Sequence, residues 1–240
     1  MTKEKLGHVY VFNHTTFINK SLETRYGSTK DCRDIEKVFQ ELKFDVIIYN
    51  DLLYQEILDK LSNIAKMDYS NHDCLIIFVL THGKKDKLFA RDVDYYPDVY
   101  WTSFTERSGF MYKPKLIFIQ GSRGDEADDS VQLRKTTETE TIVPRTYSVP
   151  YVPDVLLMFS CYDVYFSWRS GVTGSAFVQC LCKEFESRAK NTDLLTLLTF
   201  VNRRLSMHFM RVPNQVVNVR QMATIVSTLN KVLYFRPIDK

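Results

Sequence analysis

The sequence predicts an α/β fold built on an open, mostly parallel sheet with helices on both faces. Strand-like and helix-like segments alternate through the first half of the chain. Two strand-like segments, CLIIFVL (74–80) and KLIFIQ (115–120), are continuous apolar runs, which is typical of strands buried on both faces of a parallel sheet. Sites in such sheets form beyond the carboxyl ends of the strands, so the residues after these runs are the first to consider.

The remaining elements of the first half follow from periodicity. HVYVFN (8–13) and DVIIYN (45–50) are predicted strands. The helix between them, for which Ser28 or Thr29 is the expected N-cap, has its apolar face at Cys32, Ile35, Val38, Phe39 and Leu42. A second amphipathic helix has its apolar face at Leu53, Ile57, Leu58, Leu61 and Ile64. A short helix is expected from Tyr95 to Phe104.

The chain changes character at residues 125–146, which are polar, charged and almost free of apolar periodicity. This composition predicts a flexible linker or a long loop. Structure is expected to resume with a strand at 155–160 and a helix with an apolar side at Phe177, Val178, Leu181, Cys182 and Phe185. Another helix is predicted from about Asp193 to Met210, and a last strand from about Ala223 to Ser227.

Composition argues against several functions. The net charge of +3 is spread along the chain, so we expect no nucleic-acid partner. The first residues, MTKEKLG, are charged with no apolar region after them, and the longest apolar run (75–80) is too short to cross a bilayer. We therefore expect no membrane partner and a cytoplasmic protein. The five cysteines lack the spacing of a zinc site, so we expect reduced thiols, no metal and no cofactor, with Cys32, Cys180 and Cys182 in the core.

Chemistry-bearing residues follow both apolar runs: Thr81-His82-Gly83 after the first, and Gln120-Gly121-Ser122-Arg123-Gly124 after the second. If these strands are neighbours, His82 and Ser122 share one sheet edge. A nucleophile beside a base, near backbone amides, is the arrangement that acyl transfer requires. By itself the pattern leaves a structural histidine and an ordinary Ser-x-Gly turn as alternatives.

Longer motifs resemble those of the caspase family. QGSRG (120–124) is similar to the family's Gln-Ala-Cys-Arg/Gln-Gly signature, and THG (81–83) to its Ser-His-Gly. SWRSGVTGSAF (167–177) resembles the small-subunit motif, and RQMATIVSTLNKVLYF (220–235) the family's last strand. TRYGSTKDCRDIEKVF (24–39) resembles the segment that leads into its first helix. The matches come in the family's order over about residues 8–236.

The resemblance implies a caspase-like sandwich with a central, mostly parallel six-stranded sheet and helices on both faces. It divides the single domain into a large-subunit part (1–128), an intersubunit linker (129–146) and a small-subunit part (147–240). It also implies that Ala223, Thr224, Ile225, Val226 and Ser227 form the strand through which two protomers dimerise.

The resemblance also assigns site residues. His82 matches the catalytic histidine, and Gly83 and Ser122 stand at the two oxyanion-hole amides. Arg25, Gln120 and Arg169 match the pocket for a substrate aspartate, in which two guanidinium groups can bind one carboxylate. Trp168 and Phe166 match aromatic walls of the neighbouring subsite; ordinary core packing is the alternative.

Ser122 departs from the family because it stands where the cysteine nucleophile belongs. A thiol with a pKa near 8.5 provides thiolate at neutral pH, whereas a serine hydroxyl needs a well-placed base and an orienting partner. We therefore predict a pseudo-caspase without useful proteolysis. Ala90 also stands where the family has a glycine, which is expected to restrict the oxyanion loop.

Three functions remain open. The first is regulation of an active caspase, and hence of apoptosis, by heterodimerisation; the sequence does not distinguish this from a homodimer. The second is a decoy that binds Asp-containing peptides or caspase inhibitor proteins without cleavage. The third is an Asp-specific cysteine endopeptidase whose cysteine was replaced by serine, or a slow serine enzyme. An active partner is expected to cut the linker after Asp125, Asp128 or Asp129.

Overall fold

A six-stranded sheet forms the centre of the molecule. The computed structural model describes residues 6–84, 86–104, 109–110, 113–121, 153–161, 169–212, 215–219 and 221–235, with the backbone alone for 169, 209–212 and 215–219. The strand order is β13 (Thr224–Ser227), β8 (Val155–Phe159), β7 (Lys115–Gln120), β3 (Cys74–Leu80), β1 (Gly7–Asn13) and β2 (Phe44–Asn50). Only β13 runs antiparallel to its neighbour. The predicted mostly parallel six-stranded sheet is confirmed.

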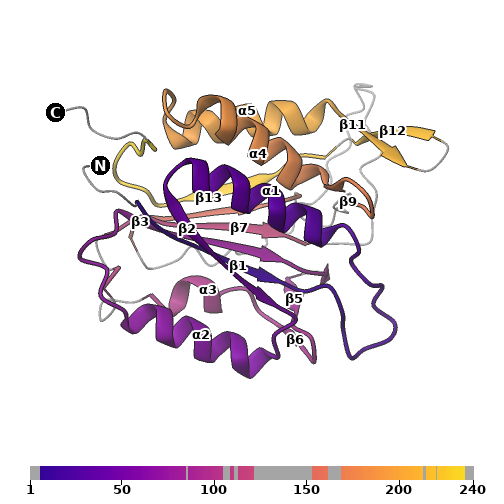
Figure 1. Cartoon of the computed structure of the whole chain (residues 1–240), viewed down its shortest axis with the longest axis horizontal. Helices are drawn as coiled ribbons and strands as arrows, with labels where there is room; N and C mark the ends of the chain where they lie inside the picture. The colour runs from indigo at the N-terminus through magenta and orange to yellow at the C-terminus, as the bar shows by residue number, and fades with distance from the viewer. Residues whose placement is uncertain are drawn as a thin grey trace, which may run out of the picture.

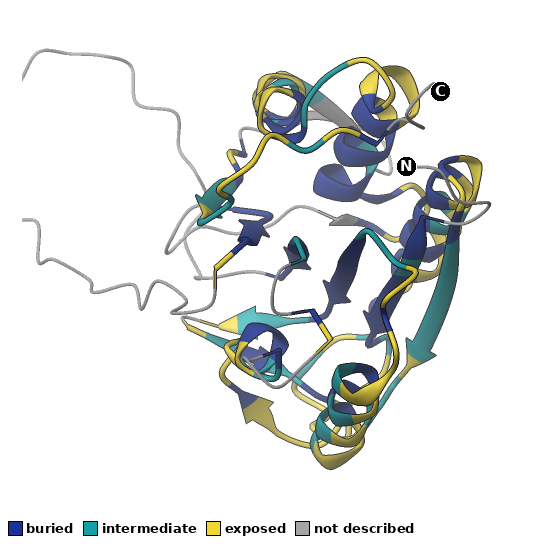
Figure 2. Cartoon of the chain, turned by 90° about the vertical axis from the view of Figure 1, so that its left-hand side faces the viewer, coloured by how far each residue is buried: buried dark blue, intermediate teal, exposed yellow. Residues whose placement is uncertain are grey.

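Helices cover both faces of this sheet (Figure 1). On one face lie α1 (Ser28–Glu41), α4 (Ala176–Arg188) and α5 (Leu194–Ser206), and on the other α2 (Tyr54–Lys66) and α3 (Val99–Thr102). Successive strand residues point to opposite faces of the sheet. Val9 and Val11 therefore join the core under α1, α4 and α5, whereas Tyr10 and Phe12 join the core under α2. Buried residues accordingly line both sides of the sheet (Figure 2).

Short strands that the sequence did not predict surround the sheet. Residues after β3 form a three-stranded sheet of β4 (Gly83–Lys84), β5 (Lys87–Phe89) and β6 (Asp94–Tyr95). The strands β9 (Arg169–Ser170) and β10 (Gly174–Ser175) pair ahead of α4. A hairpin of β11 (His208–Val212) and β12 (Gln215–Val219) follows α5.

Three predicted boundaries were wrong. The helix expected from Tyr95 to Phe104 is only the four residues of α3, because Asp94 and Tyr95 pair with β5 instead. The N-cap of α1 is Gly27, and the Ser28 hydroxyl bonds to Thr15 Oγ1 at 2.9 Å. The predicted helix 193–210 ends at Ser206 because the following residues join the β11–β12 hairpin.

The edge strand β13 begins one residue later than predicted. Ala223 precedes it and is held by Asn202 of α5, whose side-chain amide accepts from Ala223 N and donates to Ala223 O, each at 3.0 Å. All five cysteines are buried and free, and Cys32, Cys180 and Cys182 lie in the core as predicted. No helix in the described part of the chain is long and apolar enough to span a membrane.

Candidate active site

The site lies where three parallel strands end side by side. β3 pairs with β1 on one side and β7 on the other, with Leu80 opposite both Asn13 and Gln120. Hydrogen bonds continue one step past the strand ends, from His14 N to Leu80 O (2.8 Å) and from Thr81 N to Gln120 O (3.0 Å). The residues after all three strands therefore meet at one edge, which confirms that His82 follows the strand adjacent to the one that leads to Ser122.

The imidazole of His82 is oriented by the backbone. Its Nε2 lies 2.7 Å from the carbonyl oxygen of Glu23, and its ring centroid is 5.0 Å from that of Phe17. A carbonyl oxygen can only accept, so Nε2 carries a proton. In the neutral tautomer that fits this contact, Nδ1 is the unprotonated nitrogen.

The β4–β5 hairpin holds the backbone around His82. Phe89 N donates to His82 O at 3.0 Å, the Thr81 hydroxyl donates to Phe89 O at 2.5 Å, and Gly83 pairs with Leu88. The residue before Ser122, Gly121, packs closely here: a Cβ on it would lie 3.6 Å from Gly83 N and 3.3 Å from Leu88 Cδ2. The backbone next to the nucleophile position and the Gly83 amide are thus neighbours, as an oxyanion hole requires.

Ala90 does not strain the oxyanion loop. It is buried, its N donates to Val93 O at 2.8 Å, and it keeps an ordinary negative φ. The described non-glycine residues with positive φ are Lys43, Asp51 and Asp154. The backbone at Ala90 is therefore unstrained, and the expected restriction of the loop stays a prediction.

The β1–α1 loop fixes Arg25. This side chain is fully buried; its Nη1 donates to His14 O at 2.7 Å and its backbone N to Thr15 O at 2.9 Å. Asp51, which follows β2, accepts from Thr15 N (2.6 Å) and from the N and Oγ1 of Thr16 (both 3.0 Å). One carboxylate thus anchors the loop that carries both Arg25 and the Glu23 carbonyl.

His14 contributes to this loop as a neutral group. Burial, helped by the nearby Arg25 charge, lowers its pKa to about 4, although the bond between Nε2 and Leu52 O (3.1 Å) opposes this shift. A neutral imidazole adds no second positive charge beside Arg25. The sequence analysis did not single out His14, Glu23 or Asp51. His14 and Asp51 directly follow predicted strands, and sites in parallel sheets form beyond the carboxyl ends of the strands.

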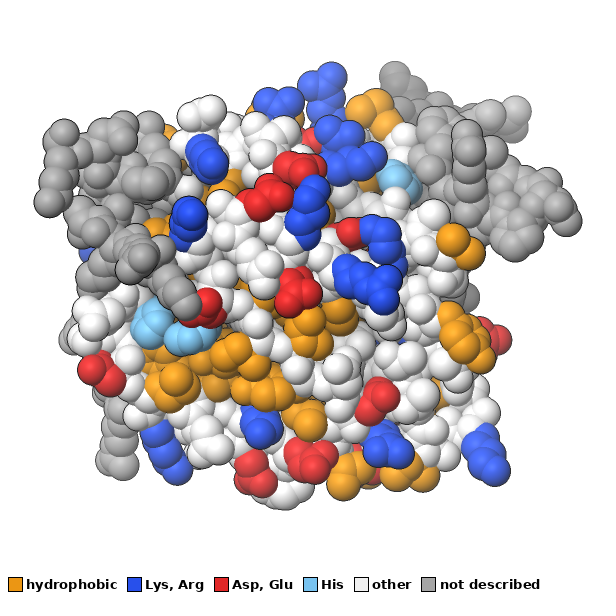
Figure 3. Space-filling model, viewed as in Figure 1, with side chains coloured by type: hydrophobic (Ala, Val, Ile, Leu, Met, Phe, Trp, Pro, Cys, Tyr) orange, Lys and Arg blue, Asp and Glu red, His pale blue; other side chains and the backbone are white. Residues whose placement is uncertain are grey.

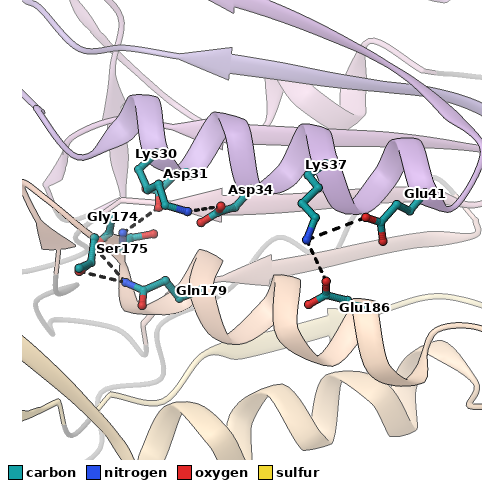
Figure 4. Close-up of polar contacts among 10 residues, drawn as sticks. Lys30, Asp31, Asp34, Lys37, Glu41, Gly174, Ser175, Gln179 and Glu186 are labelled. Carbon is teal, nitrogen blue, oxygen red and sulfur yellow. Dashed lines mark hydrogen bonds and ion pairs between the residues drawn. The ribbon is translucent and has the colours of Figure 1, made fainter.

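A tight contact joins the start of α1 to the segment after Arg169. Asp31 Oδ1 accepts from Ser175 N at 2.8 Å, and Gly174, at φ 86°, leaves room for this carboxylate (Figure 4). A Cβ on Gly27 would collide with Ser170 O. Arg25 and the Arg169 backbone therefore belong to two segments that are packed together, as a shared pocket requires.

Gln120 is buried at the end of β7. Arg169 has its backbone described in β9 but not its side chain. Ser122, Phe166, Trp168, Asp125, Asp128 and Asp129 lie outside the described residues. The structure thus brings together the segments of His82, Gly83, Arg25 and Gln120, and the remaining site residues stay predictions.

The fold and this edge define an α/β protein in which a histidine, an adjacent backbone amide and a buried arginine follow neighbouring parallel strands. The family model of the caspase domain matches residues 6–234. The chain belongs to the caspase family.

Individual relatives agree with this assignment. The chain is 37% identical to "Caspase-1" of Spodoptera frugiperda (98% of this chain, 80% of the relative). It is 33% identical to "Caspase drICE" of Drosophila melanogaster (98% and 71%). The crystal structure of the Spodoptera protein matches with a TM-score of 0.85 at 35% identity, covering 98% of this chain and 92% of that one.

Proposed function

We propose that this chain is a catalytically inactive caspase homologue that regulates an active caspase, and through it apoptosis, by forming a heterodimer. One observation carries the proposal: serine occupies position 122 of the QGSRG motif, whereas the strand ends, the His82 contact and the buried Arg25 are those of an ordered site. A scaffold kept without its nucleophile supports a role in binding.

The surroundings of His82 support the loss of catalysis. In serine proteases a buried carboxylate bonds the imidazole and stabilises the imidazolium that forms when the hydroxyl loses its proton. Here the neutral Glu23 carbonyl takes that place on Nε2. It orients the ring but, unlike a carboxylate, supplies no negative charge to stabilise an imidazolium. Loss of a serine-protease nucleophile lowers turnover by roughly a millionfold, which gives the scale of the defect.

The edge strand supports the dimer. Thr228 N donates to Val155 O at 2.8 Å, so Thr228 faces β8. Because hydrogen-bonding direction alternates along an antiparallel pair, the N–H groups of Ile225 and Ser227 point away from the sheet. They are available to a strand from a second chain. A homodimer through the same strand would compete with the heterodimer.

A matched pair of variants tests this interface. Ser227→Pro removes an outward N–H and spares the bonds to β8, whereas Ser227→Ala keeps that N–H. We expect the unmodified chain and Ser227→Ala to co-elute with an active caspase of the same organism at micromolar concentrations and to change its peptide turnover. Ser227→Pro should do neither. Absence of any complex, or equal binding by both variants, contradicts the proposal.

Substrate binding without cleavage is the second candidate, supported by the buried, loop-anchored Arg25. A peptide ending in an aspartic acid, without a reactive aldehyde, is the suitable probe because an aldehyde needs the missing thiol. Calorimetry should show binding that Arg25→Gln abolishes. Undetectable binding by the unmodified chain rules out the decoy and leaves the dimer proposal intact.

We also propose that residues 129–146 link large-subunit and small-subunit parts, and that an active partner cuts after Asp125, Asp128 or Asp129. Incubation with that caspase should yield two fragments divided near residue 129. An intact band contradicts this. The five free, buried thiols support placing this function in the reducing cytoplasm.

A further inference from the structure

A surface cavity of about 420 Å³ lies between the C-terminal halves of α4 and α5 and the first residue of β11. It belongs to the helical layer, and the site at the sheet edge does not use it. Arg188, Arg203, Arg204 and His208 line it, together with Glu184. Three guanidinium groups against one carboxylate leave a net charge of +2 at neutral pH. Figure 3 shows Lys and Arg side chains gathered on this upper part of the molecule, over α4 and α5.

Glu184 fixes two of the arginines. Its side chain is only 3% exposed, and its two oxygens accept from Arg188 Nε at 2.8 Å and from Arg204 Nε at 2.5 Å. The Arg188 guanidinium also lies 4.2 Å from the centre of the Phe200 ring. A buried carboxylate and an aromatic face therefore hold these cations in place before any ligand arrives, which reduces the entropy lost on binding.

The positive charge that lines this cavity exceeds what the Glu184 carboxylate neutralises. The Arg203 guanidinium forms no ion pair or hydrogen bond with any residue that the structure describes. The contacts of Arg188 and Arg204 with Glu184 use only their Nε atoms. The neighbouring His208 has its pKa lowered by burial first and then by the charges of Lys183 and Arg204. Guanidinium N–H groups are thus left to bind an external anion.

We propose that this α4–α5 cavity is a binding site for a phosphate monoester. A phosphate monoester carries a charge of about −1.5 to −2 at pH 7, which matches the excess of +2, whereas a single carboxylate would neutralise only half of it. Guanidinium groups bind phosphate oxygens through paired, charge-assisted hydrogen bonds. Phe200 and Met207 give the cavity an apolar wall for the organic part of the ester. The phosphate comes from a small metabolite or from a phosphorylated side chain of a partner protein.

Calorimetry at constant ionic strength tests the site with phenyl phosphate, inorganic phosphate and a phosphoserine peptide. Arg203→Gln is the informative variant because this side chain has no described structural partner whose loss would disturb the fold. Arg33→Gln, which removes an exposed arginine from α1, is the matched control for charge. We expect phenyl phosphate to bind more tightly than inorganic phosphate. Arg203→Gln should weaken phenyl phosphate roughly tenfold or more, as loss of a charge-assisted bond predicts, with Arg33→Gln unchanged.

The same experiment distinguishes a small metabolite from a phosphorylated partner protein as the source of the phosphate. Tighter binding of the peptide than of phenyl phosphate assigns the site to a phosphorylated partner, and the reverse order assigns it to a small molecule. No binding at 10 mM phenyl phosphate, equal binding by Arg203→Gln and the unmodified chain, or equal weakening by both variants overturns the proposal.

Discussion

The imidazole Nε2 of His82 lies 2.7 Å from the carbonyl oxygen of Glu23, although 59 residues separate them in the sequence. This contact determines which nitrogen carries the proton. We predict that ¹⁵N NMR of the neutral imidazole shows the Nε2-protonated tautomer of His82, with His82→Gln identifying the signal. A dominant Nδ1-protonated form would contradict the role given to the Glu23 carbonyl.

Asp51 is expected to stabilise the loop that carries Arg25, because its carboxylate accepts three hydrogen bonds from Thr15 and Thr16. Asp51→Ala should lower the free energy of unfolding by about 2–4 kcal/mol, since each bond to a charged group contributes about 1.5–3 kcal/mol and the losses overlap. Urea denaturation measures this. Asp59→Asn, an exposed aspartate on α2, is the control and should change stability by no more than about 0.5 kcal/mol. Equal effects of the two substitutions would disprove the anchoring role.

Gly174 and Gly171 form a matched pair on the loop ahead of α4. Gly174 has φ 86° and its Cβ would collide with Asp31 Oδ1, whereas a Cβ on Gly171 would meet only Tyr26 Cβ at 3.8 Å. Gly174→Ala should therefore cost more than about 3 kcal/mol, from the disfavoured φ and the lost Asp31–Ser175 bond. Gly171→Ala should cost less than about 0.5 kcal/mol. Thermal unfolding of both variants checks this, and a stable Gly174→Ala protein would show that the α1–β10 contact is dispensable.

His14 gives the fold a dependence on pH. Its pKa is about 4 in the folded chain, because burial disfavours the charged form, and about 6.5 when unfolded. The unfolded chain therefore binds the extra proton between these values, so the stability contributed by neutral His14 is complete above pH 6.5 and is lost as the pH falls toward 4. The loss reaches about 3 kcal/mol. Urea midpoints of His14→Gln should fall less between pH 7 and 4.5 than those of the unmodified chain; parallel curves would contradict the assignment.

Strong local patterns made the central fold predictable. The continuous apolar runs of β3 and β7 have the predicted bounds, and the helical spacing from Cys32 to Leu42 describes the buried face of α1. The β11–β12 hairpin was missed because the end of α5 continues into residues of similar character. Pro213-Asn214 between the two strands was the turn signal that could have separated them.

The site was predictable only in part. Motifs singled out His82, Gly83, Arg25 and Gln120 as candidates because those side chains or amides belong to short patterns, and the structure places their segments at one edge of the sheet. The Glu23 carbonyl escaped sequence reasoning because every residue has one, and its role depends on where the loop passes. The role of Asp51 was not predicted because a single aspartate after a strand can have many structural roles. Only its three hydrogen bonds in the structure show that it anchors the loop.

Hydrolysis of a fluorogenic peptide ending in aspartate tests the central claim most directly. The unmodified chain, its Ser122→Cys variant and its His82→Ala variant are compared at the same concentration. We predict that the unmodified chain releases no fluorophore above the His82→Ala background. Activity in Ser122→Cys alone would show that base and pocket are intact and favour the substrate-holding role; inactivity of all three leaves the dimer surface as the functional part. Turnover by the unmodified chain that disappears in His82→Ala would contradict the claim that this caspase homologue is catalytically inactive.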